Sequence, residues 1–261
     1  MQNPPRSFYD KVFWMSMNAD TSLWTELADK IAVRDYVESR LGRELLPELY
    51  GTYRTAQDVD FDELPSSFVI KTNNGCASNY IVRSKDSANL EDIRAGLSKW
   101  LKFPYGDLTG QLHYSRIKPR ILAEELLYQA DAPDKTLTDY KFYCFNGSAR
   151  YCYVVMDRVF DQKHSHRRMM YDMQWAELPD VFIEGVSLGH IEKPSALGAM
   201  IETAETLSRG IPFVRVDLYE VDGAVKFSEM TFMPGMDPGF IEAFQEAMGS
   251  MSALPEASRG R

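Results

Sequence analysis

The clearest alternation of apolar and polar residues lies towards the C-terminal end, where two predicted strands span Phe213–Glu220 and Val225–Phe232. Between them stands Asp222-Gly223, the strongest short-range signal for a β-hairpin. Successive side chains of a strand point to opposite sides, so the first strand has one apolar and one polar face. The polar face carries Arg215, Asp217 and Tyr219.

The predicted hairpin places one acid inside each strand, Asp217 in the first and Glu229 in the second. Two such acids are costly unless a cation lies between them, and their oxygen atoms suit Mg²⁺ together with phosphate and water. Both positions are odd-numbered, so the side chains share a face only if the loop has an odd length or a bulge adds a residue. The alternative is a solvated hairpin whose acids form weak surface pairs with Arg215.

Hydrophobic periodicity predicts further helices and strands along the chain. The predicted helices span residues 22–41, 88–102, 194–209 and 238–248. The predicted strands span 66–71, 80–83 and 120–127, followed by a hairpin that begins at 139, turns at Asn146-Gly147 and returns through 151–156.

The strand at 66–71 ends in Lys71 and is followed by a loop of small and amide residues at 72–79. Such a loop lets backbone N–H groups approach an anion closely, and Lys71 adds a point charge for phosphate oxygens. It is not a Walker loop, since the sequence contains no G-x-x-x-x-G-K-[ST]. The alternative is a polar hairpin loop without a ligand.

Length and composition narrow the class of protein. The 261 residues allow one large domain or two small ones, and the net charge of −9 argues against a general nucleic-acid-binding protein. Cys76, Cys144 and Cys152 contain no C-x-x-C pair, so we expect neither a disulfide framework nor a zinc site. There is no signal peptide and no apolar run of roughly eighteen residues, which predicts a cytoplasmic protein without membrane insertion.

Basic residues concentrate in the segment 157–170 of this otherwise acidic protein. Within it, His164 and His166 have the spacing of two metal ligands on one strand face, but no Cys or third His is near in sequence. We expect a solvated loop; the alternatives are a lid that binds an anion or carboxylate and a transition-metal site.

The motifs, taken together, resemble a known superfamily. R-x-D, an Asp-Gly turn, an acid followed two residues later by a polar residue, and P-G-M resemble the C-terminal metal-binding hairpin of ATP-grasp enzymes such as D-alanine–D-alanine ligase. The order of motifs also matches: Asp29-Lys30, Lys71 with its loop, Glu124-Glu125, Asp-x-Lys at 139–141 and the hairpin. The phrases DYKFYCFNG, FVRVDLY and EMTFMPG are most similar to the TupA-like branch, associated with teichuronopeptide and other surface-polysaccharide biosynthesis.

The resemblance implies an α+β fold, the ATP-grasp fold, in which two α/β subdomains with antiparallel sheets enclose ATP. Asp217, Glu229 and Thr231 would hold Mg²⁺, although the ligases usually carry Asn at the position of Thr231. The implied catalytic residues are Arg215, facing the acyl phosphate, and Lys141, meeting the γ-phosphate. The implied nucleotide-binding residues are Lys30 and Lys71 at the phosphates, Asn74, Gly75 and Ser78 in the phosphate loop, Glu124, Glu125 and Leu127 at the adenine edge, and Asp139 at the ribose.

Without the resemblance, several of these residues have plainer interpretations. Lys30 is then a surface charge on a helix, and Asp139 with Lys141 is a surface pair on one strand face. One of the acids at 124–125 is then a salt-bridged residue of an edge strand.

The domain organisation follows from the same motifs. We expect a short N-terminal segment at 1–64, an ATP-grasp domain at 65–250 and a disordered tail at 251–261. The small subdomain would span 65–124 and the larger one 125–250. The ligases carry a longer N-terminal domain that helps to bind substrate, so a homodimer or a partner enzyme is expected to supply that region.

The implied function is an ATP-dependent carboxylate–amine ligase that uses Mg²⁺ and forms a C–N (amide) bond through an acyl phosphate. Its substrates would be a small-molecule carboxylate and an amine, in surface-polysaccharide or peptide-like metabolite biosynthesis. The alternative is an ATP-grasp-fold kinase for a small molecule or sugar, since the same residues would phosphorylate an alcohol. A third interpretation, a nucleotide-binding scaffold without turnover, predicts loss of the metal acids, and both are present.

Overall fold

The computed structural model describes residues 4–132, 135–157, 166–235 and 238–255. The chain divides into two compact units. Unit 1 comprises Met1–Thr21, Arg40–Leu45 and Tyr128–Arg261, and unit 2 comprises Ser22–Ser39 and Leu46–Leu127. Each unit contains one antiparallel sheet together with helices, which confirms the α+β class expected from the sequence.

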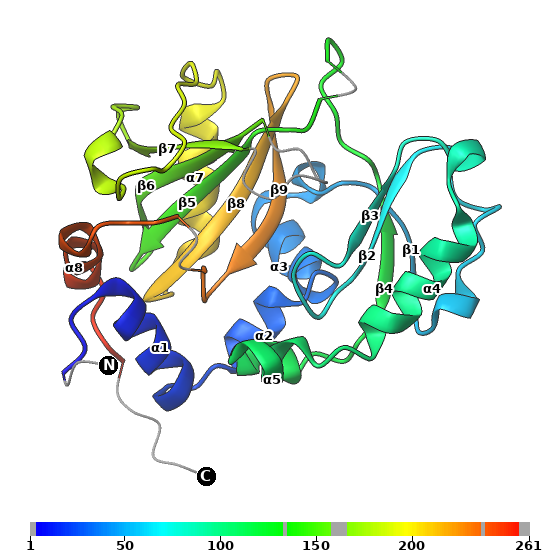
Figure 1. Ribbon diagram of the computed structural model, residues 1–261, viewed down its shortest axis with the longest axis horizontal. Helices are drawn as coiled ribbons and strands as arrows, with labels where there is room; N and C mark the ends of the chain where they lie inside the picture. Colours follow the sequence, from blue (N-terminus) through cyan, green and yellow to red (C-terminus); the bar gives the residue numbers. More distant parts are fainter. Residues whose placement is uncertain (1–3, 133–134, 158–165, 236–237, 256–261) are drawn as a thin grey trace. The chain divides into compact units, whose positions relative to one another are not determined.

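Unit 2 is built on a four-stranded sheet in the order β1-β4-β2-β3 (Figure 1). The strands are β1 (Leu49–Tyr53), β2 (Phe68–Thr72), β3 (Asn79–Val82) and β4 (Ile121–Glu124). The helices that lie mainly in this unit are α2 (Ser22–Ala28), α3 (Ala32–Leu41), α4 (Leu90–Leu101), α5 (Tyr105–Thr109) and α6 (Leu112–Ser115). Two 3₁₀ turns are η2 (Ala56–Asp58) and η3 (Lys85–Ser87).

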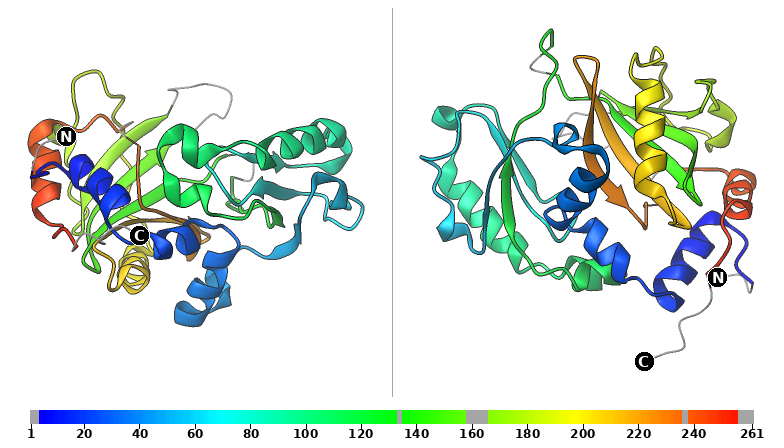
Figure 2. Two further views of the ribbon diagram at one scale, coloured as in Figure 1. Left: turned by 90° about the horizontal axis from the view of Figure 1, so that it is seen from below. Right: turned by 180° about the vertical axis from the view of Figure 1, so that it is seen from behind.

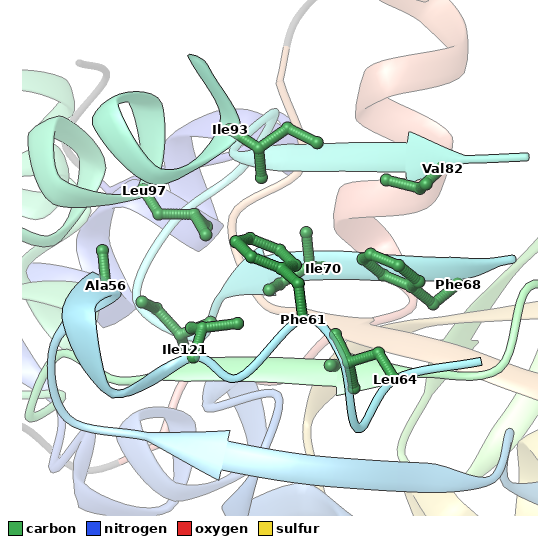
Figure 3. Packing of buried hydrophobic residues seen from close by; sticks show 11 residues of the cluster. Ala56, Phe61, Leu64, Phe68, Ile70, Val82, Ile93, Leu97 and Ile121 are labelled. Atoms are coloured by element: carbon green, nitrogen blue, oxygen red, sulfur yellow. The ribbon is translucent and has the colours of Figure 1, made fainter. Parts of the chain in front are cut away.

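Helix α4 covers one face of this sheet and encloses the core of unit 2. Asn89 caps the helix by accepting a hydrogen bond from a backbone N–H of the first turn (3.2 Å). Ile93 and Leu97 lie one turn apart and are both buried. Figure 3 shows them packed with Phe68 and Ile70 of β2. Other members of the cluster are Ala56, Val59, Phe61, Leu64, Val82, Ile121 and Ala123.

The single helix predicted for residues 22–41 is wrong, because the structure has two helices, α2 and α3, with a break at Asp29. The Asp29 carboxylate accepts hydrogen bonds from the backbone N–H groups of Ile31 (2.8 Å) and Ala32 (3.4 Å). A carboxylate that caps a new helix N-terminus satisfies N–H groups that would otherwise lack a partner. The apolar periodicity continues through the break, so it could not reveal it.

Unit 1 is built on a five-stranded sheet in the order β7-β6-β5-β8-β9. The strands are β5 (Asp139–Phe145), β6 (Ser148–Met156), β7 (Arg167–Asp172), β8 (Phe213–Val221) and β9 (Ala224–Thr231). The helices are α1 (Phe8–Asn18), α7 (Leu197–Ser208) and α8 (Glu242–Ser250), with 3₁₀ turns η1 (Arg43–Leu45) and η4 (Pro179–Val181). Helix α7 lies across one face of the sheet against β5, β6 and β8 (Figure 2), and α1 packs on α8.

The N-terminal segment predicted at 1–64 contributes residues to both units. Its apolar side chains explain the division. In unit 1, Phe8 packs edge-on against Phe213 with 4.7 Å between ring centroids. In unit 2, Phe61 and Leu64 are buried in the core.

Two residues of the tail expected to be disordered, Met251 and Ser252, are held by hydrogen bonds. Their carbonyl oxygens accept from the Asn146 amide (2.8 Å) and the Lys11 ammonium (2.6 Å), and Ser252 is buried. Residues 256–261 of that tail, and residues 158–165 of the predicted basic loop with His164, lie outside the described residues. In the described part of the chain, no helix is long and apolar enough to cross a membrane.

His113 in α6 should make the stability of the protein sensitive to acid. Burial lowers the pKa of this imidazole from 6.5 to about 4, and the charge of Arg116 acts in the same direction. Because the unfolded chain binds the proton first, the free energy of unfolding should fall as pH drops from 6.5 towards 4, by about 2–3 kcal/mol from this residue. Urea unfolding at pH 7 and pH 4.5 should show a smaller loss for His113→Phe. The exposed His190→Gln should lose no less stability than the native protein, because hydrogen bonds with Glu177 and Glu192 raise the pKa of His190 and its protonation favours the folded state. A loss in His113→Phe as large as that of the native protein would contradict this account.

Candidate functional site

The C-terminal hairpin brings its two acids onto one face through a bulge. Strands β8 and β9 are neighbours (Figure 1) and are joined by Asp222-Gly223. Asp217 stands directly opposite Glu229. The next pair is Leu218 with Phe227, so Ser228 is an extra residue in β9. A regular two-residue turn alone would have placed the acids on opposite faces. The bulge is one of the two solutions that the sequence left open.

Arg215 lies between the two acids. Its guanidinium donates from Nε and Nη2 to the two carboxylate oxygens of Asp217, both at 2.7 Å. The same Nη2 lies 3.7 Å from Glu229 Oε1 and donates to Thr231 Oγ1 (3.0 Å). Burial alone would lower the pKa of Arg215, but the Asp217 and Glu229 carboxylates outweigh it and hold this pKa well above its ordinary value. The arginine is therefore a permanent cation in this hairpin.

Lys141 joins the hairpin from the neighbouring strand. Strand β5 pairs with β8 so that Lys141 is opposite Asp217. Its Nζ lies 2.7 Å from Asp217 Oδ2 and 3.4 Å from Asp139 Oδ1. We call these five residues the charged cluster: Asp139, Lys141, Arg215, Asp217 and Glu229. All but the half-buried Arg215 and Glu229 are buried, and buried charges of this kind are costly unless paired.

Tyr219 also faces the charged cluster. It lies on β8 two residues beyond Asp217, and therefore on the same face. The Asp139 carboxylate, then burial, then Glu229 and Asp217 raise its pKa well above the ordinary value, against a hydrogen bond with Ser228 that acts to lower it. Its phenol stays neutral and keeps its O–H donor.

The hairpin presents oxygen atoms of the kind that Mg²⁺ prefers as ligands. In the part of the chain that the structure describes, no three His, Cys, Asp or Glu side chains form a metal site by themselves. Magnesium needs no such set, because it is usually held by one or two carboxylates, water and substrate phosphates. Asp217, Glu229 and Thr231 present hard oxygen atoms on one face, with Thr231 Oγ1 3.4 Å from Glu229 Oε1. Three carboxylates also face two basic groups, which leaves excess negative charge for a cation to balance.

A second group of predicted residues lies on the sheet of unit 2. Lys71 of β2 forms an ion pair with Glu124 of β4 through Oε1, and Arg34 of α3 reaches Glu124 Oε2 at 3.3 Å. Arg34 also donates to the carbonyl of Pro47 (2.5 Å). The carboxylate of Glu124, implied by the resemblance to read adenine, is thus held by two cations. Arg34 was not among the predicted site residues, because a helical arginine is usually a surface charge.

The loop at residues 72–79, which is predicted from the sequence to bind phosphate and is here called the phosphate loop, is held by Asp29 and Lys30 between α2 and α3. Lys30 Nζ donates to the Gly75 carbonyl (2.7 Å), and the Asp29 carboxylate accepts from the Asn73 amide (2.9 Å). The Asn73 side-chain oxygen in turn accepts from the Arg120 backbone N–H (2.7 Å). The structure therefore brings Lys30 to the loop that carries Asn74, Gly75 and Ser78. Asp29 and Asn73 were not among the predicted site residues.

The predicted adenine-edge residues lie at and beyond the end of β4. The strand expected at 120–127 ends at Glu124. The Glu125 N–H donates to the Glu48 carbonyl (2.8 Å), and the Glu48 N–H donates to the Glu125 carboxylate (3.1 Å). The backbone donor of Glu125 is thus already engaged within unit 2. Leu127 is the last residue of that unit.

Comparison with known proteins identifies the family. A family model described as TupA-like ATPgrasp matches residues 10–251. The chain belongs to the TupA-like ATP-grasp family. This TupA-like chain is also similar to a D-alanine–D-alanine ligase from Bacillus anthracis, with 15% identity and a TM-score of 0.50 over 97% of this chain and 73% of that one. The likeness, at this identity, shows the ATP-grasp fold.

Other solved structures match over a smaller share of their length. The same Bacillus anthracis ligase complexed with ATP matches with 15% identity and a TM-score of 0.49, over 87% of this chain and 62% of that one. The ATP-grasp ligase PsnB complexed with a minimal precursor matches with 11% identity and a TM-score of 0.44, over 89% and 62%. The TupA-like chain thus spans about 62% of the length of each. No curated protein matches.

Replacing Lys30 should loosen the phosphate loop with little change in global stability. Lys30→Met keeps the aliphatic stem but loses the hydrogen bond to the Gly75 carbonyl, so we expect less than about 1 kcal/mol of destabilisation. Hydrogen exchange at residues 74–78 should accelerate, because local opening no longer breaks that contact. Lys85→Met is a matched control, since Lys85 donates to the carbonyls of Phe61 (2.8 Å) and Leu64 (2.6 Å) instead. Equal loop exchange in both variants would refute the anchoring role.

Proposed function

We propose that this TupA-like ATP-grasp protein is an ATP-dependent carboxylate–amine ligase. The observation that carries the proposal is the hairpin in which Arg215 lies between Asp217 and Glu229 on one face. Membership of the ATP-grasp family supports the use of ATP. The D-alanine–D-alanine ligase that shares the fold supports ligation as the reaction.

The proposed reaction has two steps. A carboxylate oxygen of the first substrate attacks the γ-phosphorus of ATP, the bond to the β–γ bridging oxygen breaks, and ADP leaves. The nitrogen of the amine then attacks the carbonyl carbon of the acyl phosphate, and phosphate and a proton are released as the C–N bond forms. The substrates are a small-molecule carboxylate and an amine.

Each charged residue would stabilise a different part of the reacting groups. Bound Mg²⁺, held by Asp217, Glu229 and Thr231, would neutralise phosphate charge. Arg215 would stabilise the acyl phosphate as it forms, and Lys141 the γ-phosphate, since fixed cations act most strongly where charge develops. The proposed nucleotide contacts are Lys30 and Lys71 with Asn74, Gly75 and Ser78 at the phosphates, Glu124, Glu125 and Leu127 at adenine, and Asp139 at the ribose.

The setting of the reaction is also a proposal. The family resemblance favours surface-polysaccharide or peptide-like metabolite biosynthesis in the cytoplasm, where ATP is available. A homodimer or a partner enzyme would supply substrate-binding residues. In this proposal the catalytic domain spans 65–250, and the N-terminal segment contributes Lys30 to the nucleotide contacts.

Trapping of the acyl phosphate tests the proposal. The protein is incubated with MgATP, hydroxylamine and a panel of candidate carboxylates, and hydroxamate and ADP are measured. A ligase should give both products in equal amounts, because hydroxylamine replaces the amine. A stable phosphorylated alcohol that is insensitive to hydroxylamine would decide for a kinase. If MgATP at millimolar concentration does not raise the melting temperature, nucleotide binding itself is excluded.

A further inference from the structure

Unit 2 contains a cavity behind the phosphate loop. Its volume is about 330 Å³, and it lies between loop residues 74–78 and the C-terminal end of α4. Lys71 and Thr72 are consecutive in β2, so their side chains point to opposite faces of the sheet. Thr72 lines the cavity, whereas Lys71 contacts Glu124. The cavity is therefore on the face away from the proposed phosphate-binding lysine.

One side of the cavity is aromatic. Trp100, Phe103 and Tyr105 line it, and the ring centroid of Trp100 lies 4.7 Å from that of Tyr80. Phe103 is 45% exposed, although a large apolar side chain usually gains by burial. The Tyr105 ring lies close to the loop, since a Cβ added at Gly75 would be 3.2 Å from it. These rings offer a surface on which a flat apolar group could stack.

The other side of the cavity is polar. Lys99 lines it, is exposed, and forms no ion pair among the described residues. Asn74 also lines it and is 7% exposed, and its side-chain oxygen has no hydrogen-bond partner in the described part of the chain. The exposed Cys76 thiol completes this wall. A cation beside aromatic walls favours a ligand with one anionic group and one ring.

We propose that this cavity binds a small organic anion that carries an apolar ring, with the ring against Trp100 and Phe103 and the anion at Lys99. The volume is at the lower end of the range of about 300–1,000 Å³ for small-molecule pockets, which suits a compact ligand. Because residues 74–78 form one wall, an occupant restrains the loop from the face opposite Lys71. The site needs neither ATP nor turnover, so its test is independent of the proposed ligase activity.

Indole-3-acetate is the probe, with neutral indole-3-acetamide beside it. Cys76 reports occupancy, because it is exposed in the wall while Cys144 and Cys152 are buried. Binding is followed by calorimetry, and iodoacetamide alkylation of Cys76 is followed by mass spectrometry on the full chain. We expect saturable binding of one equivalent of indole-3-acetate and slower Cys76 alkylation at saturation. Cys76→Ser should remove the labelled product.

Matched variants locate the ligand. Lys99→Gln should weaken indole-3-acetate by roughly three- to fivefold, as for an exposed ion pair, and leave indole-3-acetamide unchanged. Phe103→Ser should weaken both probes. Lys102→Gln and Leu108→Ser change exposed side chains outside the cavity and should bind as the native protein does. Unprotected Cys76 at saturating probe, non-saturable binding, or equal affinities of Lys99→Gln and Lys102→Gln would each overturn the site.

Discussion

Arg215→Ala is expected to lower hydroxamate formation by roughly 10²–10³-fold while leaving MgATP affinity nearly unchanged, because removal of one preorganised charge at the reacting centre costs about that much. Arg215 is held between Asp217 and Glu229, one pleat along β8 from Asp217. Its contact should strengthen only as negative charge develops at the acyl phosphate. An interaction made mainly in the transition state lowers kcat rather than binding.

Two controls separate this effect from a loss of structure. Arg215→Lys keeps the charge but not the two-pronged contact with Asp217, and should fall between the native protein and Arg215→Ala. Arg150→Ala removes an exposed arginine from β6 of the same sheet and should be fully active. Hydroxamate formation and MgATP binding are measured on the same preparations. If Arg215→Ala weakens MgATP as strongly as it slows turnover, the arginine belongs to nucleotide binding instead.

Glu124→Ala is expected to destabilise the protein by about 3–5 kcal/mol, as when one partner of a buried ion pair is removed. Glu124 is 7% exposed and stands between Lys71 and Arg34. Its loss leaves two like charges close together in a largely buried place. The melting temperature should fall by roughly 10 °C or more, measured by calorimetry.

The neighbouring Glu125→Ala provides the matched control. It removes a half-buried carboxylate that accepts one hydrogen bond, from the Glu48 N–H at 3.1 Å, so we expect a loss of about 1 kcal/mol. Glu124→Gln keeps the size and some hydrogen bonding and should fall between the two alanine variants. If Glu124→Ala is as stable as Glu125→Ala, the pairs with Lys71 and Arg34 do not stabilise unit 2.

Local signals in the sequence predicted those parts of the fold that depend on neighbouring residues. Asp222-Gly223 marked the hairpin, and apolar spacing marked α4 and β2. The break at Asp29 was missed because its cap acts through one side chain and leaves the apolar spacing intact. Helix propensity and the spacing of apolar residues carry no information about such a side-chain contact.

In the candidate site, too, contacts between residues far apart in sequence could not be predicted from local signals. The pairing of Lys141 with Asp217 depends on β5 lying beside β8, far apart in sequence. The family resemblance implied a role for Lys141 at the γ-phosphate, but it did not predict this pairing. Arg34 and Tyr219 carried no local signal, since an amphipathic helix and a strand face accept such residues without any ligand. Their partners, Glu124 and Asp139, become visible only when the sheets are assembled.

The extra residue at Ser228 has a consequence for sequence comparison. If the pairing ran regularly from the Asp-Gly turn, Glu229 would lie opposite Val216. The bulge changes the register by one residue, so that Glu229 lies opposite Asp217. A hairpin one residue shorter, without the bulge, would present the same pair of acids. Relatives whose acids are spaced one residue closer can therefore keep an identical site, and an alignment that forbids a gap between the two strands would wrongly score that acid as lost.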